Sequence, residues 1–440
     1  MRLTFKNSYA FTARKRASAH IFGDDLRISK AIGDFKENRP LAQKTVYTLY
    51  NGAIGSILSP PAAGPADRFR GGIEGPIALP VAPCPSPWES PMPVSDCELT
   101  RMFEHVLTLS RVDGTQSVAV LKSHYSNPRV VKAAMEASQR LGARVYGVEL
   151  PSFNHPMAMG NDMTAYCGDT ALTGNHAAQR ALEAADLVID TMLLLHSPEQ
   201  EQILKTGTRI LLAVEPPEVL ARLLPSLADK ERVLAAAERL KTARSIRVRS
   251  AAGTDFTARL GQYPTVTEYG FADEPGRWDH WPSGFLFSWP DEGSAEGTLV
   301  LDVGEMLLPF KSYVRDRITL EVEDGFVRRI HGGFDAEYLR DYMAYFRDPE
   351  VYGISHIGWG LQPRAQWTAM GLHDRNDGMC MDARAFYGNF LFSTGPNTEV
   401  GGSRKTPCHM DIAMRRCDVL LDGDPVVLAG DVVAPQGSRA

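Results

Sequence analysis

The residues best suited to chemistry form a short pattern near the end of the chain, His409-Met410-Asp411 in the segment KTPCHMDIAMRRC. If this segment is extended, residues i and i+2 project from the same face, so the imidazole and the carboxylate can reach one metal ion. A histidine and an aspartate at this spacing also form ordinary surface ion pairs, which is the alternative. A third candidate ligand is His356, in the apolar segment GISHIGWGLQP. For His356 the alternative is a buried histidine bonded to the backbone.

Two neutral imidazoles and one carboxylate make the facial set of ligands that holds mononuclear Fe(II). Such a set leaves about three coordination positions open, which suits a substrate with two donor atoms and O₂. The six cysteines are scattered and include no C-x-x-C pair, which disfavours a zinc site made of thiolates and favours free thiols in a reducing compartment. His373-Asp374, in GLHDRNDGM, is a rival pair of ligands. Adjacent residues of a strand point to opposite faces, so we expect that pair to form a loop network instead.

Four further residues are candidates for contact with a substrate. His196 ends the apolar run DLVIDTMLLLH, so we expect it at the carboxyl end of a buried parallel strand, where ligands bind and a neutral histidine can act as a general base. His280 lies among aromatic residues in GRWDHWPSGF, which suit a flat heteroaromatic pocket. Ser393 and Thr394 could hydrogen-bond a substrate from the loop FSTGPNTEVGG. The alternatives are a turn cap for His196, simple packing for His280 and a plain surface turn for the loop.

The elements that must position these residues fall into two parts. From Met92 to Ser250, strands such as SVAVLKSHY and RVYGVELP alternate with helices such as NPRVVKAAMEASQRLGA, and Ser95 is a candidate N-cap for the first helix. This alternation predicts a parallel sheet covered by helices. After residue 251, alternating apolar residues and Asp-Gly turns predict antiparallel strands, interrupted by one helix in FDAEYLRDYMAYFRD. We therefore expect an α/β protein, with a parallel-sheet α/β domain over residues 92–250 and an α+β metal-binding domain over residues 251–440.

Residues 1–91 differ from the rest because they are crowded with Pro, Gly and Ala and show no sustained period of helix or strand. Such a stretch buries too little apolar surface to offset the entropy of its chain. Either these residues are a disordered extension, or translation starts at Met92 and the upstream part is an artefact of the gene model. We favour the second interpretation.

The composition is that of a globular protein, with 44% apolar and 23% charged residues. A net charge of -6 argues against a nucleic-acid partner, and no Gly-rich dinucleotide or Walker motif is present. No apolar run approaches the roughly 18 residues that a membrane-spanning helix needs. The segment from Met1 to His20 lacks the apolar core of a signal peptide. We therefore expect a cytoplasmic protein with neither a nucleic-acid nor a membrane partner.

From Met92 to the C-terminus the chain resembles the 2,5-dihydroxypyridine 5,6-dioxygenase family of nicotinate catabolism. The resemblance rests on long segments: ELPSFNHPMAMGNDMTAYCGDTALTGN, EYGFADEPGRWDHWPSGFLF, YGISHIGWGLQPRAQWTAMGLHDRNDGMCMDARAFYGNFLFSTGPNTEVGG and KTPCHMDI. It implies an enzyme that uses O₂ to cleave the 5,6 bond of 2,5-dihydroxypyridine, giving N-formylmaleamate. It also implies a homo-oligomer that needs Fe(II) and no organic cofactor.

The same resemblance assigns roles to residues. It implies one Fe(II) per subunit, held by His356, His409 and Asp411. It places the active-site base at His196, and it places His280 near the substrate.

The fold implied by the resemblance is that of the thermophilic metallo-aminopeptidases, whose site holds two metal ions and includes two glutamates. Here the equivalent places hold the stretch Pro282-Ser283-Gly284 and Asn389. Without those carboxylates a second divalent ion loses its ligands, which favours one iron. A metallo-aminopeptidase-type hydrolase is the rival enzyme, and a metal-binding protein without activity is the rival outside catalysis.

Overall fold

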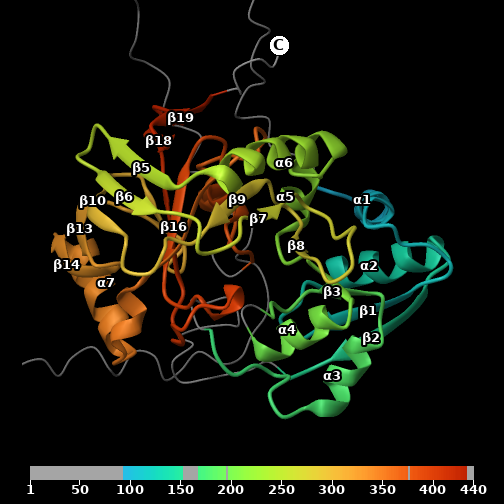
Figure 1. Ribbon diagram of the computed structural model, residues 1–440. Helices are drawn as coiled ribbons and strands as arrows, with labels where there is room; N and C mark the ends of the chain where they lie inside the picture. The colour runs from blue at the N-terminus through green and yellow to red at the C-terminus, as the bar shows by residue number, and fades with distance from the viewer. Residues whose placement is uncertain (1–92, 152–166, 195–196, 375–376, 434–440) are drawn as a thin grey trace, which may run out of the picture. The chain divides into compact units, whose positions relative to one another are not determined.

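Residues 93–151, 167–194, 197–374 and 377–433 are the part of the chain that the computed structural model describes (Figure 1). They form one parallel and two antiparallel β-sheets with helices packed against them. The α/β class expected from the sequence is confirmed. Within these residues no helix has both the length and the apolar character that a membrane crossing requires.

Eight α-helices occur in the described residues. The predicted N-cap of α1 (Asp96–Leu109) is confirmed: Ser95 Oγ accepts a hydrogen bond from the Glu98 N–H, and the Glu98 carboxylate accepts one from the Ser95 N–H at 2.9 Å. The other α-helices are α2 (Pro128–Arg140), α3 (His176–Glu183), α4 (Pro198–Lys205), α5 (Pro217–Arg222), α6 (Leu227–Thr242), α7 (Phe334–Tyr345) and α8 (Met381–Arg384). Short 3-10 helices are η1 (Pro349–Tyr352), η2 (Ala369–Leu372) and η3 (Thr398–Val400).

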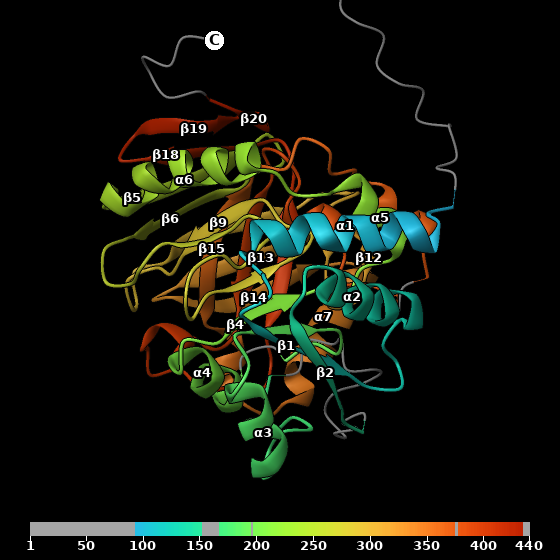
Figure 2. The ribbon, with the colours of Figure 1, turned by 90° about the vertical axis from the view of Figure 1, so that its right-hand side faces the viewer.

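The parallel sheet has the strand order β2-β1-β3-β4-β8. Its strands are β1 (Ser117–Lys122), β2 (Arg144–Glu149), β3 (Leu187–Asp190), β4 (Arg209–Leu212) and β8 (Trp278–His280). Every residue of β3 and β4 is buried, as expected for central strands with both faces covered. Helices α1 to α4 lie around this sheet in both views (Figure 1, Figure 2). The alternation of strands and helices in the sequence therefore predicts the sheet correctly.

One strand of this sheet is shorter than predicted. We expected the run DLVIDTMLLLH to continue as a strand to His196, but β3 ends at Asp190. The Asp190 carboxylate accepts hydrogen bonds from three successive backbone N–H groups, those of residues 192–194, at 2.7 to 2.9 Å. These bonds give the backbone an alternative to the sheet ladder, so the chain turns there. His196 lies outside the described residues.

An eight-stranded antiparallel sheet has the order β14-β13-β10-β6-β5-β18-β19-β20. Its strands are β5 (Ser245–Ser250), β6 (Asp255–Arg259), β10 (Glu296–Leu301), β13 (Ile318–Glu323), β14 (Phe326–Gly332), β18 (Cys417–Leu421), β19 (Asp424–Leu428) and β20 (Asp431–Val432). Two predicted Asp-Gly turns connect hairpins here, Asp324-Gly325 and Asp422-Gly423. All four turn residues have positive φ, between 51° and 93°, which matches the right-handed twist of the paired strands.

A seven-stranded antiparallel sheet has the order β12-β11-β17-β16-β15-β9-β7. Its strands are β7 (Val266–Glu268), β9 (Phe285–Ser288), β11 (Met306–Leu307), β12 (Ser312–Tyr313), β15 (Ile354–Gly360), β16 (Phe390–Thr394) and β17 (Met410–Met414). Strands β9, β15, β16 and β17 are buried along their whole length. Strand β8, from the second half of the chain, joins the parallel sheet, and β5 joins an antiparallel one. The division into domains at residue 250 stays a prediction.

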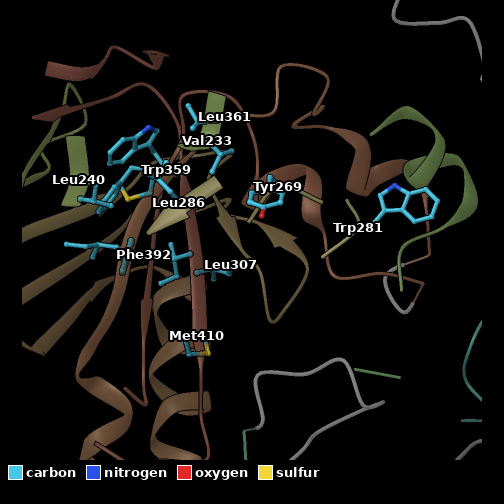
Figure 3. Packing of buried hydrophobic residues seen from close by; sticks show 14 of the residues in the cluster. Val233, Leu240, Tyr269, Trp281, Leu286, Leu307, Trp359, Leu361, Phe392 and Met410 are labelled. Carbon is cyan, nitrogen blue, oxygen red and sulfur yellow. The ribbon is translucent and has the colours of Figure 1, made fainter. Parts of the chain in front are cut away.

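The main hydrophobic core covers one face of the seven-stranded sheet. Val233 and Leu240 of α6 belong to the same buried cluster as Leu286 of β9 and Trp359 of β15 (Figure 3). The cluster continues through β16 and β17, where Met410 belongs to it. This packing fixes the strands that carry the candidate metal ligands.

A candidate metal centre and its pocket

The two faces of the seven-stranded sheet have different roles. Successive side chains of a strand point to opposite faces. Trp359 of β15 and Met410 of β17 belong to the core. His356 and Asp411 line a pocket, and each lies an odd number of positions from the core residue of its own strand. The apolar residues of the sequence pattern therefore hold the sheet in place, and the polar residues between them face the cavity.

The three predicted ligands lie together although they are far apart in the sequence. His356 belongs to β15, Asp411 belongs to β17 and His409 directly precedes β17, with β16 between the two strands. His356 Nε2 lies 3.2 Å from His409 Nε2, and Asp411 Oδ1 lies 3.1 Å from each of these nitrogens. All three side chains are buried.

The triangle of ligand atoms fits one metal ion. An ion with bonds of about 2.1 Å places two ligands roughly 3.0 Å apart at right angles and roughly 3.4 Å apart in a tetrahedron. The observed separations of 3.1 to 3.2 Å lie nearer the right-angled case, which is one face of an octahedron. Among the described residues these three form the one cluster of His, Cys, Asp and Glu with this convergence. They could hold one ion with neighbouring positions left open.

Arg384, the last residue of α8, binds the outer oxygen of the same carboxylate. Its Nε and Nη2 donate to Asp411 Oδ2 at 2.9 and 2.8 Å, while Oδ1 faces the histidines. Burial alone would raise the pKa of Asp411. Electrostatic interactions with His409 and Arg384, together with hydrogen bonds from both histidines, hold this pKa well below its usual range. The carboxylate is therefore ionised, and only Oδ1 is available to a metal.

Ser393 lies on the strand between the two ligand strands. The sequence suggested a loop for Ser393 and Thr394, but both belong to β16 and are buried, and the strand ends before Gly395, whose φ is +119°. Ser393 Oγ accepts a hydrogen bond from the His356 N–H at 3.0 Å, where the β15–β16 register is irregular. Neither residue is among those that line the pocket, so their contact with a substrate stays a prediction.

The triad opens into a cavity of about 230 Å³. Its walls are mainly apolar and include four large aromatic side chains, Phe285, Phe287 and Trp289 from the sheet around β9 and Trp278 from β8. Phe287 also packs against the His356 ring, with centroids 4.7 Å apart. The carboxyl end of β8 borders this cavity, which is the edge where parallel sheets bind ligands. A cavity of this size and lining suits a flat ring.

Two further histidines that the sequence singled out, His280 and His373, lie in different pockets. His280 ends β8 and lines the same pocket as the triad, with its Nδ1 3.1 Å from Met381 Sδ and its ring 4.3 Å from that of Trp278. Its catalytic role stays a prediction. His373 and Asp374, the rival ligand pair, line a separate and smaller pocket.

The residues that we aligned with the two peptidase glutamates do not offer side chains to the pocket. Asn389 is fully buried, and its amide donates to two backbone carbonyls at 2.6 and 3.0 Å and accepts from the Gly360 N–H at 2.6 Å. The side chains that β9 and β16 do turn toward the pocket are apolar, as Phe285 and Leu391 show. The alignment with Asn389 stays a prediction, and the amide of Asn389 supports α8.

Sequence reasoning missed several polar residues of the pocket, among them Arg384 and Glu268. Glu268 ends the short strand β7 and is 2% exposed. The signal that could have found it is a lone carboxylate within an otherwise uncharged strand segment. Arg384 left no signal, since its role depends on α8 lying beside β17.

Fold and donor set together indicate the class of this protein: an α/β enzyme with a candidate metal site of two histidines and one carboxylate, the donor set that mononuclear non-heme iron oxygenases use. The comparisons specify it further. The chain belongs to the 2,5-dihydroxypyridine 5,6-dioxygenase family, because the sequence model of that family matches residues 98–434. A curated 2,5-dihydroxypyridine 5,6-dioxygenase from Pseudomonas putida KT2440 is 82% identical over 349 residues, which make up 79% of this chain and 100% of that protein.

The solved structures that resemble this one include the following two. A 2,5-dihydroxypyridine dioxygenase from Pseudomonas putida KT2440 has 82% identity and a TM-score of 0.77, covering 79% of this chain and 100% of its own. AmpT from Thermus thermophilus has 14% identity and a TM-score of 0.50, covering 76% of this chain and 100% of its own. The second match shows the fold alone. The predicted family and the predicted aminopeptidase-like fold are both confirmed.

Proposed function

We propose that this protein is an Fe(II)-dependent dioxygenase that uses O₂ to cleave the 5,6 bond of 2,5-dihydroxypyridine, giving N-formylmaleamate in nicotinate degradation. One iron per subunit would be held by His356, His409 and Asp411. The observation that supports this most directly is the convergence of the three ligand atoms to within 3.1 to 3.2 Å, in a chain 82% identical to a protein named for that reaction. A cytoplasmic location and a homo-oligomeric state stay predictions from the sequence.

The donor set supports iron because two imidazoles and one carboxylate leave neighbouring positions open. When bound, the ferrous ion would supply the redox chemistry between O₂ and the ring, which no side chain can supply. Asp411 gives the site one negative charge, and Arg384 neutralises its outer oxygen. Among the described residues no further His, Cys, Asp or Glu converges on these three, which would leave neighbouring positions for substrate and O₂.

The chain's own residues bind, orient and shield the substrate. The aromatic side chains of Phe285, Phe287 and Trp278 line the cavity beside the triad, where they would pack against a flat ring. His196 stays our candidate to accept a proton from a ring hydroxyl. His280 lines this cavity and is a second candidate near the substrate.

Anaerobic reconstitution with Fe(II) tests the proposal. The loaded protein, exposed to O₂, should consume 2,5-dihydroxypyridine and O₂ in equal amounts, measured by loss of the substrate's absorbance and by an oxygen electrode. Protein loaded with zinc should consume neither. Bound iron without either loss would overturn the proposal. Cleavage of aminoacyl anilides by the cobalt or zinc form would favour the hydrolase instead.

A further inference from the structure

The cavity contains a second polar site away from the triad. Glu268 lies on β7, the edge strand of the same sheet, and it is paired with Phe285, whose side chain also lines the pocket. Only β9 separates β7 from the His356 strand, so the two strands lie roughly 10 Å apart. A ring that is bound at the triad can therefore extend toward Glu268.

Among the described residues no cation pairs with Glu268. Its Oε2 is buried and has no hydrogen-bond partner, although two arginines are near. Arg277 is committed to Asp279, at 2.6 and 3.0 Å, and to a backbone carbonyl. Arg384 is committed to Asp411. A carboxylate without a partner at such depth has a high desolvation cost, so the group keeps its proton.

The electrostatic surroundings agree with a neutral carboxyl group. Burial raises the pKa of Glu268 well above its ordinary range, and Asp279 and Asp411 raise it further, against Arg277 and Arg384, which lower it. A protonated carboxyl presents an O–H donor beside a carbonyl acceptor.

Trp278 offers a further donor to the same cavity. Its Nε1–H is buried without a hydrogen-bond partner, although the ring lines the pocket. Folded proteins leave few buried polar groups unpaired. Two such groups in one aromatic cavity indicate that a ligand supplies their partners.

We propose that Glu268, assisted by Trp278, recognises the lactam edge of the substrate and so determines selectivity for a nitrogen heterocycle. A 2-hydroxypyridine converts to its 2-pyridone tautomer, in which a ring N–H lies beside a C=O. This edge is complementary to a carboxylic acid, which can accept from the N–H and donate to the C=O in one two-bond pair. Hydroquinone has the same para oxygens but lacks this edge. The inference rests on the proposed function and names the residue that recognises its substrate.

Binding to the anaerobic, iron-loaded protein tests the inference without turnover. The variant Glu268→Leu removes donor and acceptor, so its affinity for 2,5-dihydroxypyridine, measured by calorimetry, should fall about 10- to 100-fold. Hydroquinone binding should change by less than about 3-fold, since no lactam edge is lost. Glu268→Gln keeps an N–H donor beside a C=O acceptor, so it should retain affinity within about 5-fold.

Two outcomes would overturn the inference. Unchanged affinity in Glu268→Leu would show that the group does not touch the substrate. Equal losses in Glu268→Gln and Glu268→Leu would show that an ionised carboxylate is needed. If Glu268→Leu does not fold, Glu268→Gln and Trp278→Phe together test the inference. Glu268→Gln should bind 2,5-dihydroxypyridine nearly as the wild type does, and Trp278→Phe should lose about 5-fold in affinity.

The proposed function fails separately. Wild-type protein that consumes no dihydroxypyridine refutes the function itself, whereas normal wild-type turnover with unaffected Glu268→Leu binding refutes only the recognition.

Discussion

Asp411 and Glu268 are carboxyl groups of one pocket on one sheet, and their surroundings are opposite. Asp411, 6% exposed, is bonded by Arg384 and two histidines, whereas Glu268, 2% exposed, has no cation bonded to it in the part of the chain that the structure describes. Burial is nearly the same, so the neighbours decide which group is ionised. The ionised end of the pocket suits a metal cation, and the neutral end suits an uncharged ring.

Both ends depend on the same rigid element. Asp411 and His356 lie on strands buried along their whole length, and Glu268 ends the edge strand of that sheet. Groups on a packed sheet keep their separation better than groups on loops. The sheet therefore fixes the distance between the metal and the recognising carboxyl.

Removal of the charge at the metal end should have the largest effect. Asp411→Asn keeps the shape of the side chain but lacks the negative charge, and it leaves Arg384 without its partner. We expect reconstituted Asp411→Asn to hold almost no iron and to lose activity by about 1000-fold or more. Iron is measured by elemental analysis of desalted protein. The control is Asp341→Asn, an exposed position on α7, which should bind iron as the wild type does. Full iron in Asp411→Asn would show that the ligand assignment is wrong.

Removal of Arg384 should make the free energy of unfolding depend more strongly on bound metal. Arg384→Met leaves Oδ2 unpaired, so the apo protein should lose about 3 kcal/mol in its free energy of unfolding. Because Oδ2 is then free for a cation, bound Fe(II) should restore much of this loss. Unfolding of the apo and loaded forms by urea gives both values.

Arg222 of α5 provides the matched control. It binds Asp382, which lies on α8 like Arg384, at 2.5 and 2.7 Å, and it does not line the pocket. Arg222→Met should lose about 1 kcal/mol, and iron should stabilise it no more than it stabilises the wild type. Equal responses of the two variants to iron would argue against a specific role of Arg384.

The sequence predicts the metal end of the pocket far better than the other end. His409 and Asp411 share a face because the strand alternates, and His356 stood out among apolar neighbours. Glu268 and Arg384 gave no comparable signal. Their importance depends on which strand and which helix end lie next to the triad, and these contacts join residues far apart in the chain.

Local chemistry explains where the fold prediction succeeded and where it did not. Ser95 as a cap and Asp324-Gly325 as a turn act within a few residues, so the sequence shows them directly. The end of β3 at Asp190 did not follow from the apolar pattern, because the side chain of Asp190 competes for the backbone. Ser393 was expected in a loop because its neighbours are polar and small, yet burial in a sheet outweighs that preference.

Ser393 allows the smallest test of how the metal end is held in place. Ser393→Ala removes the acceptor of the buried His356 N–H, so the free energy of unfolding should fall by about 1 kcal/mol. Because His356 is then held less firmly, Fe(II) affinity should weaken by about 10-fold in an anaerobic titration. Thr394→Val is the matched control, since the buried Thr394 Oγ1 has no hydrogen-bond partner. It should change stability by less than about 0.5 kcal/mol and leave iron binding unchanged. Equal effects of the two substitutions would show that Ser393 acts through packing and does not position His356.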